Sequence, residues 1–204
     1  MSFEVPDHIR PLRDAVEAFM RERVEPVEAQ LHAGDDDARA LLADLQREAK
    51  AEGLWALGHP EELGGGGLPF LDYVYVNEVQ GRSEYGQLAL GTFTLQDSLM
   101  LHRYAGAEWR ERYLAPLVQA EISPSFAMTE PEVASSDPTQ LQTTAVLDGD
   151  EWVINGHKWF TTGANRAAYT TVMCRTEPDA PDHRAFSMIV VPTDTPGYEI
   201  VRET

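Results

Sequence analysis

The densest run of chemically capable groups in this chain is Phe126–Asp137, which reads Phe-Ala-Met-Thr-Glu-Pro-Glu-Val-Ala-Ser-Ser-Asp. Thr129 and Glu132 have the spacing of a capping box, which predicts one helical turn with outward-pointing N–H groups. Ser135 and Ser136 add two hydroxyls before a turn-forming aspartate and a proline. Free N–H groups and hydroxyls together suit a pyrophosphate. The residues alone leave two interpretations open: a seat for a phosphate-bearing cofactor, or a polar connection between domains.

A second stretch, Asn155–Gly163, reads Asn-Gly-His-Lys-Trp-Phe-Thr-Thr-Gly. Its first two residues predict a tight turn, and Lys158–Thr162 is then predicted to be a strand. Side chains alternate along a strand, so Trp159 and Thr161 would share one face while Phe160 anchors the other face in the core. An aromatic plane beside a hydroxyl suits a flavin, which needs a flat apolar surface and a hydrogen-bond partner near N5. Without a cofactor, Trp159 would be an ordinary sheet-packing aromatic.

Together the two stretches closely resemble the flavin-binding signature of the acyl-CoA dehydrogenases. The resemblance runs along the whole chain and includes Gly64–Gly67 and the run Arg112–Leu117. The form with two serines is similar to the branch that is fused to kinase-like domains in animals, and to its bacterial relatives. The resemblance implies an α+β fold, with an all-helical N-terminal domain over residues 1–123 and an incomplete antiparallel β-domain over residues 124–204.

The resemblance also implies which residues contact FAD. Backbone and side chains of Phe126–Thr129 are expected on the pyrimidine side of the ring, and Trp159 and Thr161 match the family's tryptophan and its N5-contacting hydroxyl residue. Ser136, beside Asp137, is expected to touch the acyl-CoA pantetheine as well as the pyrophosphate. The commoner family pattern has glycines and one serine fewer in this loop, so the contact made by each serine stays open. The implied cofactor-binding residues are Phe126, Met128, Thr129, Ser135, Ser136, Trp159, Phe160 and Thr161.

In the family that the chain resembles, a glutamate removes the proton alpha to the thioester, and hydride passes from the beta carbon to flavin N5, leaving a trans-2-enoyl-CoA. That glutamate lies on a C-terminal helical bundle. The sequence ends at Thr204, so we expect the base to lie outside it and assign no catalytic residue. The resemblance implies FAD, an acyl-CoA substrate, an electron-transfer flavoprotein as acceptor, and a homo-oligomer for full-length members. The alternative is a non-catalytic flavin-binding or interaction module.

The bulk composition excludes several other classes of function. A formal net charge of −18 opposes binding to a phosphate backbone, so nucleic acid is not an expected partner. Cys174 is the single cysteine and lies in an apolar run, which favours a small core residue in a reducing cytoplasm. The histidines show no metal-ligand spacing, and no apolar run is long enough to cross a membrane. The N-terminus lacks the pattern of a signal peptide, and we expect a cytoplasmic protein without a metal.

Helical periodicity organises the first half of the chain. Apolar residues at helical spacing predict a helix over about 7–33, which Pro26 would bend or interrupt. Asp35–Asp37 predicts the acidic start of a second helix and fits a cap better than a metal site. Gly53 predicts the end of that helix.

The middle of the first half is less regular. Gly64–Gly67 lacks the Lys-Ser/Thr of a phosphate-binding P-loop, so a flexible turn is predicted. Residues 70–79 alternate like a strand, whereas the family resemblance implies a helix there. Residues 88–104 and 108–114 complete a helical half.

Near Pro124 the hydrophobic period changes to two. Thr143–Leu147 and Glu151–Ile154 flank an Asp-Gly-Asp turn, which is a strong hairpin signal. Tyr169–Arg175 and Ala185–Val191 are predicted as two further strands. The second half is therefore predicted to be an incomplete antiparallel sheet with an exposed edge.

Overall fold

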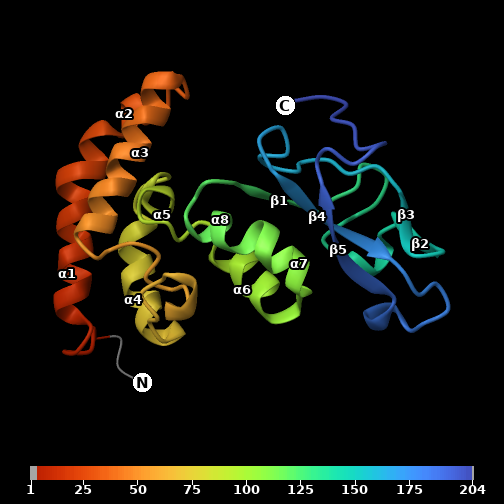
Figure 1. Cartoon of the computed structure of the whole chain (residues 1–204), viewed down its shortest axis with the longest axis horizontal. Coiled ribbons are helices and arrows are strands. Elements are labelled where there is room, and N and C mark those ends of the chain that lie inside the picture. Colours follow the sequence, from red (N-terminus) through yellow and green to blue (C-terminus); the bar gives the residue numbers. More distant parts are fainter. Residues whose placement is uncertain (1–3, 204) are drawn as a thin grey trace. The chain divides into compact units, whose positions relative to one another are not determined.

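A computed structural model of the chain describes residues 4–203. It divides into two compact units, Met1–Glu121 and Ile122–Thr204, of which the first is helical and the second is built on a sheet (Figure 1). The elements of the helical unit are α1 (Arg10–Phe19), η1 (Met20–Val24), η2 (Glu25–Val27), α2 (Glu28–Leu31), α3 (Asp36–Ala51), η3 (Glu61–Leu63), α4 (Phe70–Gln80), α5 (Gly86–Ala89), α6 (Leu95–Tyr104), α7 (Ala107–Trp109), η4 (Arg110–Leu114) and α8 (Ala115–Val118).

The first predicted helix forms as α1, η1, η2 and α2 in succession. Pro26 lies in the 3₁₀ turn η2, directly after the π-helical turn η1. Proline lacks a backbone N–H, and a change of helical winding lets the chain pass it without a full break. Val16, Phe19 and Val24 are buried on one side of this segment, which confirms the apolar stripe read from the sequence.

Helix α3 begins and ends as its sequence predicts. Asp35 is the N-cap, and its side chain accepts a hydrogen bond of 2.8 Å from the Ala38 N–H. At the other end, Gly53 has φ +71°, with Gly53 N–H bonded to Lys50 O and Leu54 N–H bonded to Ala49 O. This pair of bonds is a Schellman motif, for which glycine is favoured because it adopts left-handed φ without strain.

The glycine-rich segment Gly64–Gly67 is a turn, but a tightly packed one. A Cβ on Gly65 would overlap the backbone and side chain of His59, and Gly67 N–H donates to His59 O at 2.8 Å. The prediction of flexibility is therefore wrong, because close backbone approach is what requires glycine here. The following segment forms helix α4 and buries Tyr73 and Val76, so the helix implied by the family resemblance prevails over the strand-like alternation.

The second unit contains one five-stranded sheet. Its elements are β1 (Pro124–Ala127), η5 (Pro138–Gln140), β2 (Thr144–Asp148), β3 (Glu151–Asn155), β4 (Tyr169–Arg175), η6 (Asp182–Arg184) and β5 (Phe186–Pro192). Strand β4 is central: it pairs in parallel with β1 and, through one bridge, with β2, and it pairs antiparallel with β5. The helical-then-sheet fold class is confirmed, with one correction: the sheet is mixed rather than wholly antiparallel.

The predicted hairpin forms between β2 and β3, with Asp148 opposite Glu151. Ala127, Ala145, Val172 and Cys174 make the buried core of this unit, and Ile154, Ile189 and Val191 pack against it. Burial raises the pKa of the Cys174 thiol to about 11, which fits the predicted core residue rather than a reactive thiol. Strand β3 lies at one end of the strand order and pairs with β2 on one side, so among the described residues it forms an edge of the sheet.

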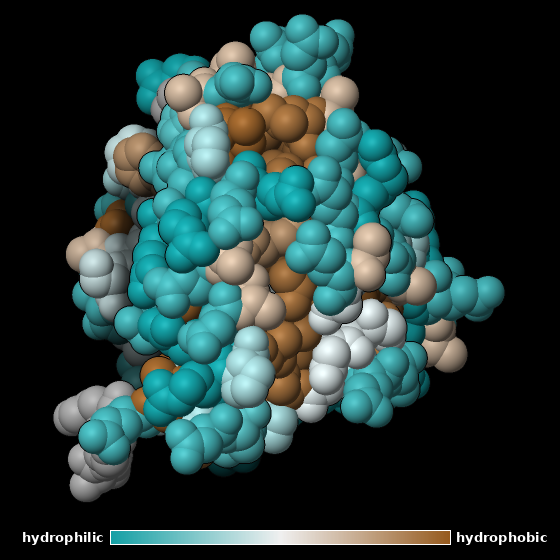
Figure 2. Space-filling model, turned by 90° about the vertical axis from the view of Figure 1, so that its left-hand side faces the viewer, coloured by the Kyte–Doolittle hydropathy of each residue, from teal (hydrophilic) through white to brown (hydrophobic). Residues whose placement is uncertain are grey.

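Figure 2 shows the side of the molecule that is formed by the helical unit. Hydrophilic side chains cover most of this side, and a strip of apolar side chains lies uncovered between them. The most exposed large apolar residues of this unit are Phe70, Leu71 and Tyr104. Over the described part of the chain, no helix has the length and apolar character needed to cross a membrane.

Candidate functional site

The segment that follows β3 does not form the predicted strand. Residues 156–162 have no regular secondary structure, and Phe160 has φ +52°, which is rare for a bulky side chain. Thr162 N–H donates to Phe160 O at 3.0 Å, which closes a tight turn around Thr161. The aromatic and β-branched composition favours a strand locally, but the chain bends here instead of extending. Residues with such sparsely populated backbone conformations are found more often at functional sites than elsewhere.

The bend changes which way the aromatic side chains point. The rings of Trp159 and Phe160 lie in contact, with centroids 4.6 Å apart and planes at 44°. Trp159 is 39% exposed and Phe160 is 65% exposed. Placing Phe160 in the core was therefore wrong, since opposite faces follow only from extended backbone. Both rings are exposed on the surface of this unit.

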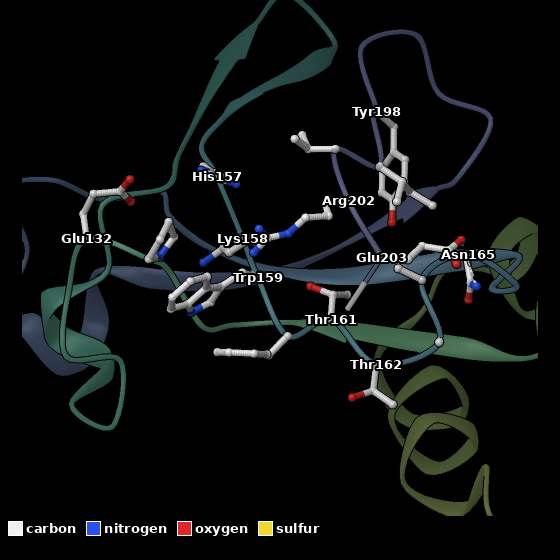
Figure 3. A pocket seen from close by; sticks show the side chains of 16 residues that line it. Glu132, His157, Lys158, Trp159, Thr161, Thr162, Asn165, Tyr198, Arg202 and Glu203 are labelled. Carbon is white, nitrogen blue, oxygen red and sulfur yellow. Dashed lines mark hydrogen bonds between the residues drawn. The ribbon is translucent and has the colours of Figure 1, made fainter.

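A cavity of about 710 Å³ lies beside these rings, entirely within the second unit. Figure 3 shows that Trp159 and Thr161 come from the bent segment, while Tyr198 and Arg202 come from the last residues described. Arg202 extends toward Lys158 and His157, so basic groups gather at one part of the wall. The lining residues are Pro131, Glu132, His157, Lys158, Trp159, Phe160, Thr161, Thr162, Gly163, Ala164, Asn165, Tyr198, Ile200, Val201, Arg202 and Glu203.

A buried ion pair joins Lys158, which lines the cavity, to Glu130. Lys158 Nζ is 2.9 Å from Glu130 Oε1, with side chains that are 10% and 3% exposed, respectively. The same carboxylate accepts hydrogen bonds from Gln142 N–H at 2.7 Å, from Thr143 N–H at 2.9 Å and from the Thr143 hydroxyl at 2.5 Å. With Lys158, these donors make Glu130 a buried acceptor of four hydrogen bonds.

These contacts decide the charge of Glu130. Burial raises the pKa of its carboxyl, but hydrogen bonds from Thr143, Gln142 and Lys158 outweigh burial and lower the pKa to about 2. The carboxylate is therefore ionised at neutral pH. An ionised, enclosed and fully hydrogen-bonded carboxylate is a poor base for a substrate carbon.

The two stretches that the sequence singles out meet through backbone contacts. Lys158 Nζ donates to Met128 O at 2.8 Å, and Trp159 N–H donates to Thr129 O at 3.0 Å. Met128 and Thr129 are half-buried, and neither contributes to the lining of the cavity. Phe126, one position before the end of β1, is also half-buried and away from the lining.

The serine-containing loop is arranged differently from its prediction. No helix begins at Thr129, so the capping box is wrong. Instead, the Ser135 hydroxyl accepts from the Glu130 N–H at 2.9 Å and lies close to two carbonyls of its own loop. Asp137 caps the short η5 helix by accepting from the Thr139 N–H. Ser136 is exposed. Of the two serines, Ser135 is bound within the loop and Ser136 faces solvent.

Sequence reasoning therefore found part of this site. Of the eight predicted cofactor contacts, Trp159, Phe160 and Thr161 line the cavity. The missed residues are the buried pair, its partner Thr143, and the cavity-lining Arg202. One signal was available: the chain has only two lysines, and Lys158 lies inside the signature. Within residues 4–203, no group of three acidic, histidine or cysteine side chains is arranged to hold a metal ion.

Comparisons with known proteins agree with this architecture. Residues 6–121 match the family model described as "Acyl-CoA dehydrogenase, N-terminal domain", and residues 125–204 match "Acyl-CoA dehydrogenase, middle domain". A Mycobacterium tuberculosis protein named "Probable acyl-CoA dehydrogenase FadE2" is 38% identical over 100% of this chain and 52% of its own length. Mouse "Acyl-CoA dehydrogenase family member 10" is 36% identical over 95% of this chain and 20% of its own length.

Solved structures give the same result. A Mycobacterium abscessus structure has a TM-score of 0.85 at 37% identity, over 96% of this chain and 52% of that chain. A crystal structure of acyl-CoA dehydrogenase from Geobacillus kaustophilus has a TM-score of 0.73 at 28% identity, over 97% of this chain and 51% of that chain. The chain thus spans about half the length of FadE2 and of these two structures, and a smaller share of the mouse relative.

Proposed function

Since the chain belongs to the acyl-CoA dehydrogenase family, we propose that it supplies the flavin-binding part of an FAD-dependent enzyme that dehydrogenates an acyl-CoA thioester between its alpha and beta carbons. We take residues 1–123 and 124–204 as its N-terminal and middle domains. The observation that supports this proposal most directly is the cavity of about 710 Å³, whose lining includes Trp159, Phe160 and Thr161. This volume lies in the range of ligand pockets.

The residues present fit the ring system of a flavin. Trp159 and Phe160 offer apolar ring surface that is otherwise left to solvent, at an energetic cost that a bound planar group would remove. Thr161 offers a hydroxyl beside them, suited to the N5 edge. Bound FAD would supply the acceptor for a hydride from the substrate beta carbon. The chain's own part is to hold the ring and exclude water from it.

The first stretch is proposed to hold the rest of the cofactor. Phe126, Met128 and Thr129 would lie toward the pyrimidine side, with Thr129 and Met128 fixed by their backbone contacts to the second stretch. Ser136 is exposed and is proposed to face the pyrophosphate and the acyl-CoA pantetheine. Ser135 is proposed to act mainly by shaping the loop, because its hydroxyl already accepts from the Glu130 N–H.

Three finer assignments belong to the same proposal. The two-serine form of the loop leads us to place the chain in the branch with animal members fused to kinase-like domains, and the match to mouse family member 10 supports this. We propose an electron-transfer flavoprotein as the electron acceptor. We also propose that the whole protein forms a homo-oligomer.

The catalytic base is proposed to come from a region beyond these two domains. The cavity wall carries two carboxylates, Glu132 and Glu203. Glu132 is exposed, and Glu203 accepts a hydrogen bond from the Asn165 amide at 3.1 Å. Neither is enclosed in the water-poor setting that removal of a weakly acidic alpha proton requires. This observation also favours a second candidate function, a flavin-binding module that does not itself dehydrogenate.

One experiment separates these functions. The chain is reconstituted with FAD and mixed anaerobically with acyl-CoAs of several chain lengths while flavin absorbance is followed. We expect no bleaching by the chain alone, and bleaching after the C-terminal half of an acyl-CoA dehydrogenase is supplied in cis or as a second polypeptide. Continued absence of bleaching with that half present would favour the non-catalytic module. Rapid bleaching by the chain alone would mean that a carboxylate of these two domains is the base.

A further inference from the structure

The buried pair Glu130–Lys158 joins three segments that are distant in sequence. Glu130 follows β1, its partners Gln142 and Thr143 precede β2, and Lys158 follows β3. Burying two charges is costly, and the cost is offset only when the geometry is good and the remaining hydrogen-bonding capacity is satisfied. Here the carboxylate accepts from four donors, so the pair meets that condition.

Lys158 also holds the backbone of the first signature stretch. Its Nζ donates to Met128 O at 2.8 Å, and the next N–H along the chain, that of Trp159, donates to Thr129 O at 3.0 Å. Two consecutive residues of one stretch therefore bond to two consecutive carbonyls of the other. This places the start of the bent segment at a fixed position against the end of β1.

The residues directly after this anchor line the cavity. Trp159 and Phe160 are exposed, and Phe160 keeps a left-handed φ of +52°. A bulky residue holds such a conformation only where its surroundings impose it. The two rings are exposed and contact each other, whereas Lys158 is held on one side by an ion pair and on the other by a carbonyl.

We propose that the Glu130–Lys158 pair is a positioning device that fixes the Trp159–Thr161 segment against Met128–Thr129 and thereby sets where a flavin ring can sit. The part of the inference that concerns the flavin rests on the proposed function. The fixing of Trp159–Thr161 against Met128–Thr129 concerns the chain alone and does not depend on a cofactor. Because each charge neutralises the other, the pair fixes the segment without adding net charge behind the ring. Glu130 and Lys158 act here as positioning residues and not as catalytic ones.

The test measures hydrogen exchange of the Trp159 backbone N–H in the full chain without cofactor. In the unaltered chain this N–H is bonded to Thr129 O and should be protected. In Lys158→Met we expect its protection to fall by roughly tenfold, in keeping with the loss of one backbone hydrogen bond. Lys50→Met, which removes the other lysine, lies in the helical unit and should leave Trp159 protection unchanged.

A double variant separates positioning from general stability. Glu130→Gln with Lys158→Met leaves no unpaired buried charge, so the unit should regain most of its stability. Its Trp159 N–H should keep the roughly tenfold lower protection expected for Lys158→Met, because no ammonium group holds Met128 O. Should Lys158→Met alone fail to fold, the double variant carries the same measurement. Wild-type protection of Trp159 in either folded variant would overturn the proposal.

Titration with FAD, followed by quenching of flavin fluorescence, gives the second arm. Folded variants in which the Trp159 backbone N–H exchanges faster should bind FAD more weakly than the unaltered chain and Lys50→Met. If the unaltered chain binds no FAD while Trp159 protection responds as expected, flavin binding by this chain fails and the local positioning stands. If all variants bind FAD equally although Trp159 protection is lost, the segment is not what places the flavin, and the positioning proposal fails.

Discussion

The two units differ in where they place paired charges. In the helical unit, ion pairs such as Arg39–Asp36 lie at the surface. Buried polar groups there are neutral: burial lowers the pKa of His59 to about 4, so its ring is uncharged at neutral pH. In the sheet unit, an ion pair is buried while Trp159 and Phe160 are exposed.

The helical unit follows the usual distribution of charge, in which paired charges face water. The sheet unit departs from it at the Glu130–Lys158 pair, and Lys158 also lines the cavity. Departures that cost stability are expected where a protein binds or reacts. The buried pair in the sheet unit therefore supports the proposed flavin site there, and the experiments below are arranged to break or sharpen the contrast between the units.

The largest effect is expected from removing one charge of the buried pair. Lys158→Met leaves Glu130 ionised and enclosed without its cation, which should lower the free energy of unfolding of the sheet unit by roughly 3–5 kcal/mol. Arg39→Met removes one charge of an exposed pair in the helical unit and should change stability by less than about 1 kcal/mol. Urea unfolding measures both. Equal effects would remove the contrast between the units.

Acid should weaken the sheet unit through the same pair. The Glu130 pKa is lowered from an ordinary 4.5 to about 2, so its contribution is fully present above about pH 4.5 and is lost as the pH falls toward 2. The contribution is on the order of 3 kcal/mol. Unfolding free energies of the unaltered chain and Glu130→Gln should therefore converge on acidification. A constant difference down to the lowest pH would contradict the lowered pKa.

A smaller effect is expected at the exposed ring. Phe160→Ala removes a side chain that is 65% exposed and should cost less than about 1 kcal/mol, whereas Leu117→Ala in the core of the helical unit should cost about 2–5 kcal/mol. Thermal unfolding of the two variants compares them directly. A loss at Phe160 as large as that at Leu117 would mean that the ring is enclosed in solution.

The sequence predicts most of the helical unit because its signals are local. Asp35 and Gly53 mark the ends of α3 through their own conformational preferences, and the Asp-Gly-Asp turn marks the β2–β3 hairpin in the same way. Parallel pairing of β1 with β4 joins residues more than forty positions apart, and no local signal reports it. That is why the sheet was predicted as antiparallel throughout.

The candidate site is only partly predictable for a related reason. Trp, Phe and Thr favour strands, yet the backbone at Phe160 is bent, and the hydrogen bonds of Lys158 to Glu130 and Met128 hold the adjoining residue in place. A glutamate before a proline gives no sign that four donors will enclose it. Tertiary contacts therefore override local preference at the place where function is proposed.

An effect on cofactor affinity, with little change in stability, is expected at the hydroxyl beside the rings. Thr161→Val keeps shape and removes one hydrogen-bonding group, so FAD affinity should fall by about 1 kcal/mol, or roughly fivefold, with the flavin spectrum altered. Thr162→Val changes a neighbouring exposed threonine of the same wall and serves as the matched control. Fluorescence titration compares the two variants. Equal affinities would remove Thr161 from the proposed flavin contacts.

The most direct measurement of the central claim is a map of FAD binding on the isotope-labelled chain by NMR. If the cavity beside Trp159 is the flavin site, FAD should shift the amide resonances of residues 156–163 and 198–203 and the indole resonance of Trp159. The indole N–H of Trp55 in the helical unit, which donates to Val118 O, serves as an internal reference. Its resonance should not shift when FAD is added. Saturating FAD that shifts other residues and leaves Trp159 unchanged would contradict the account.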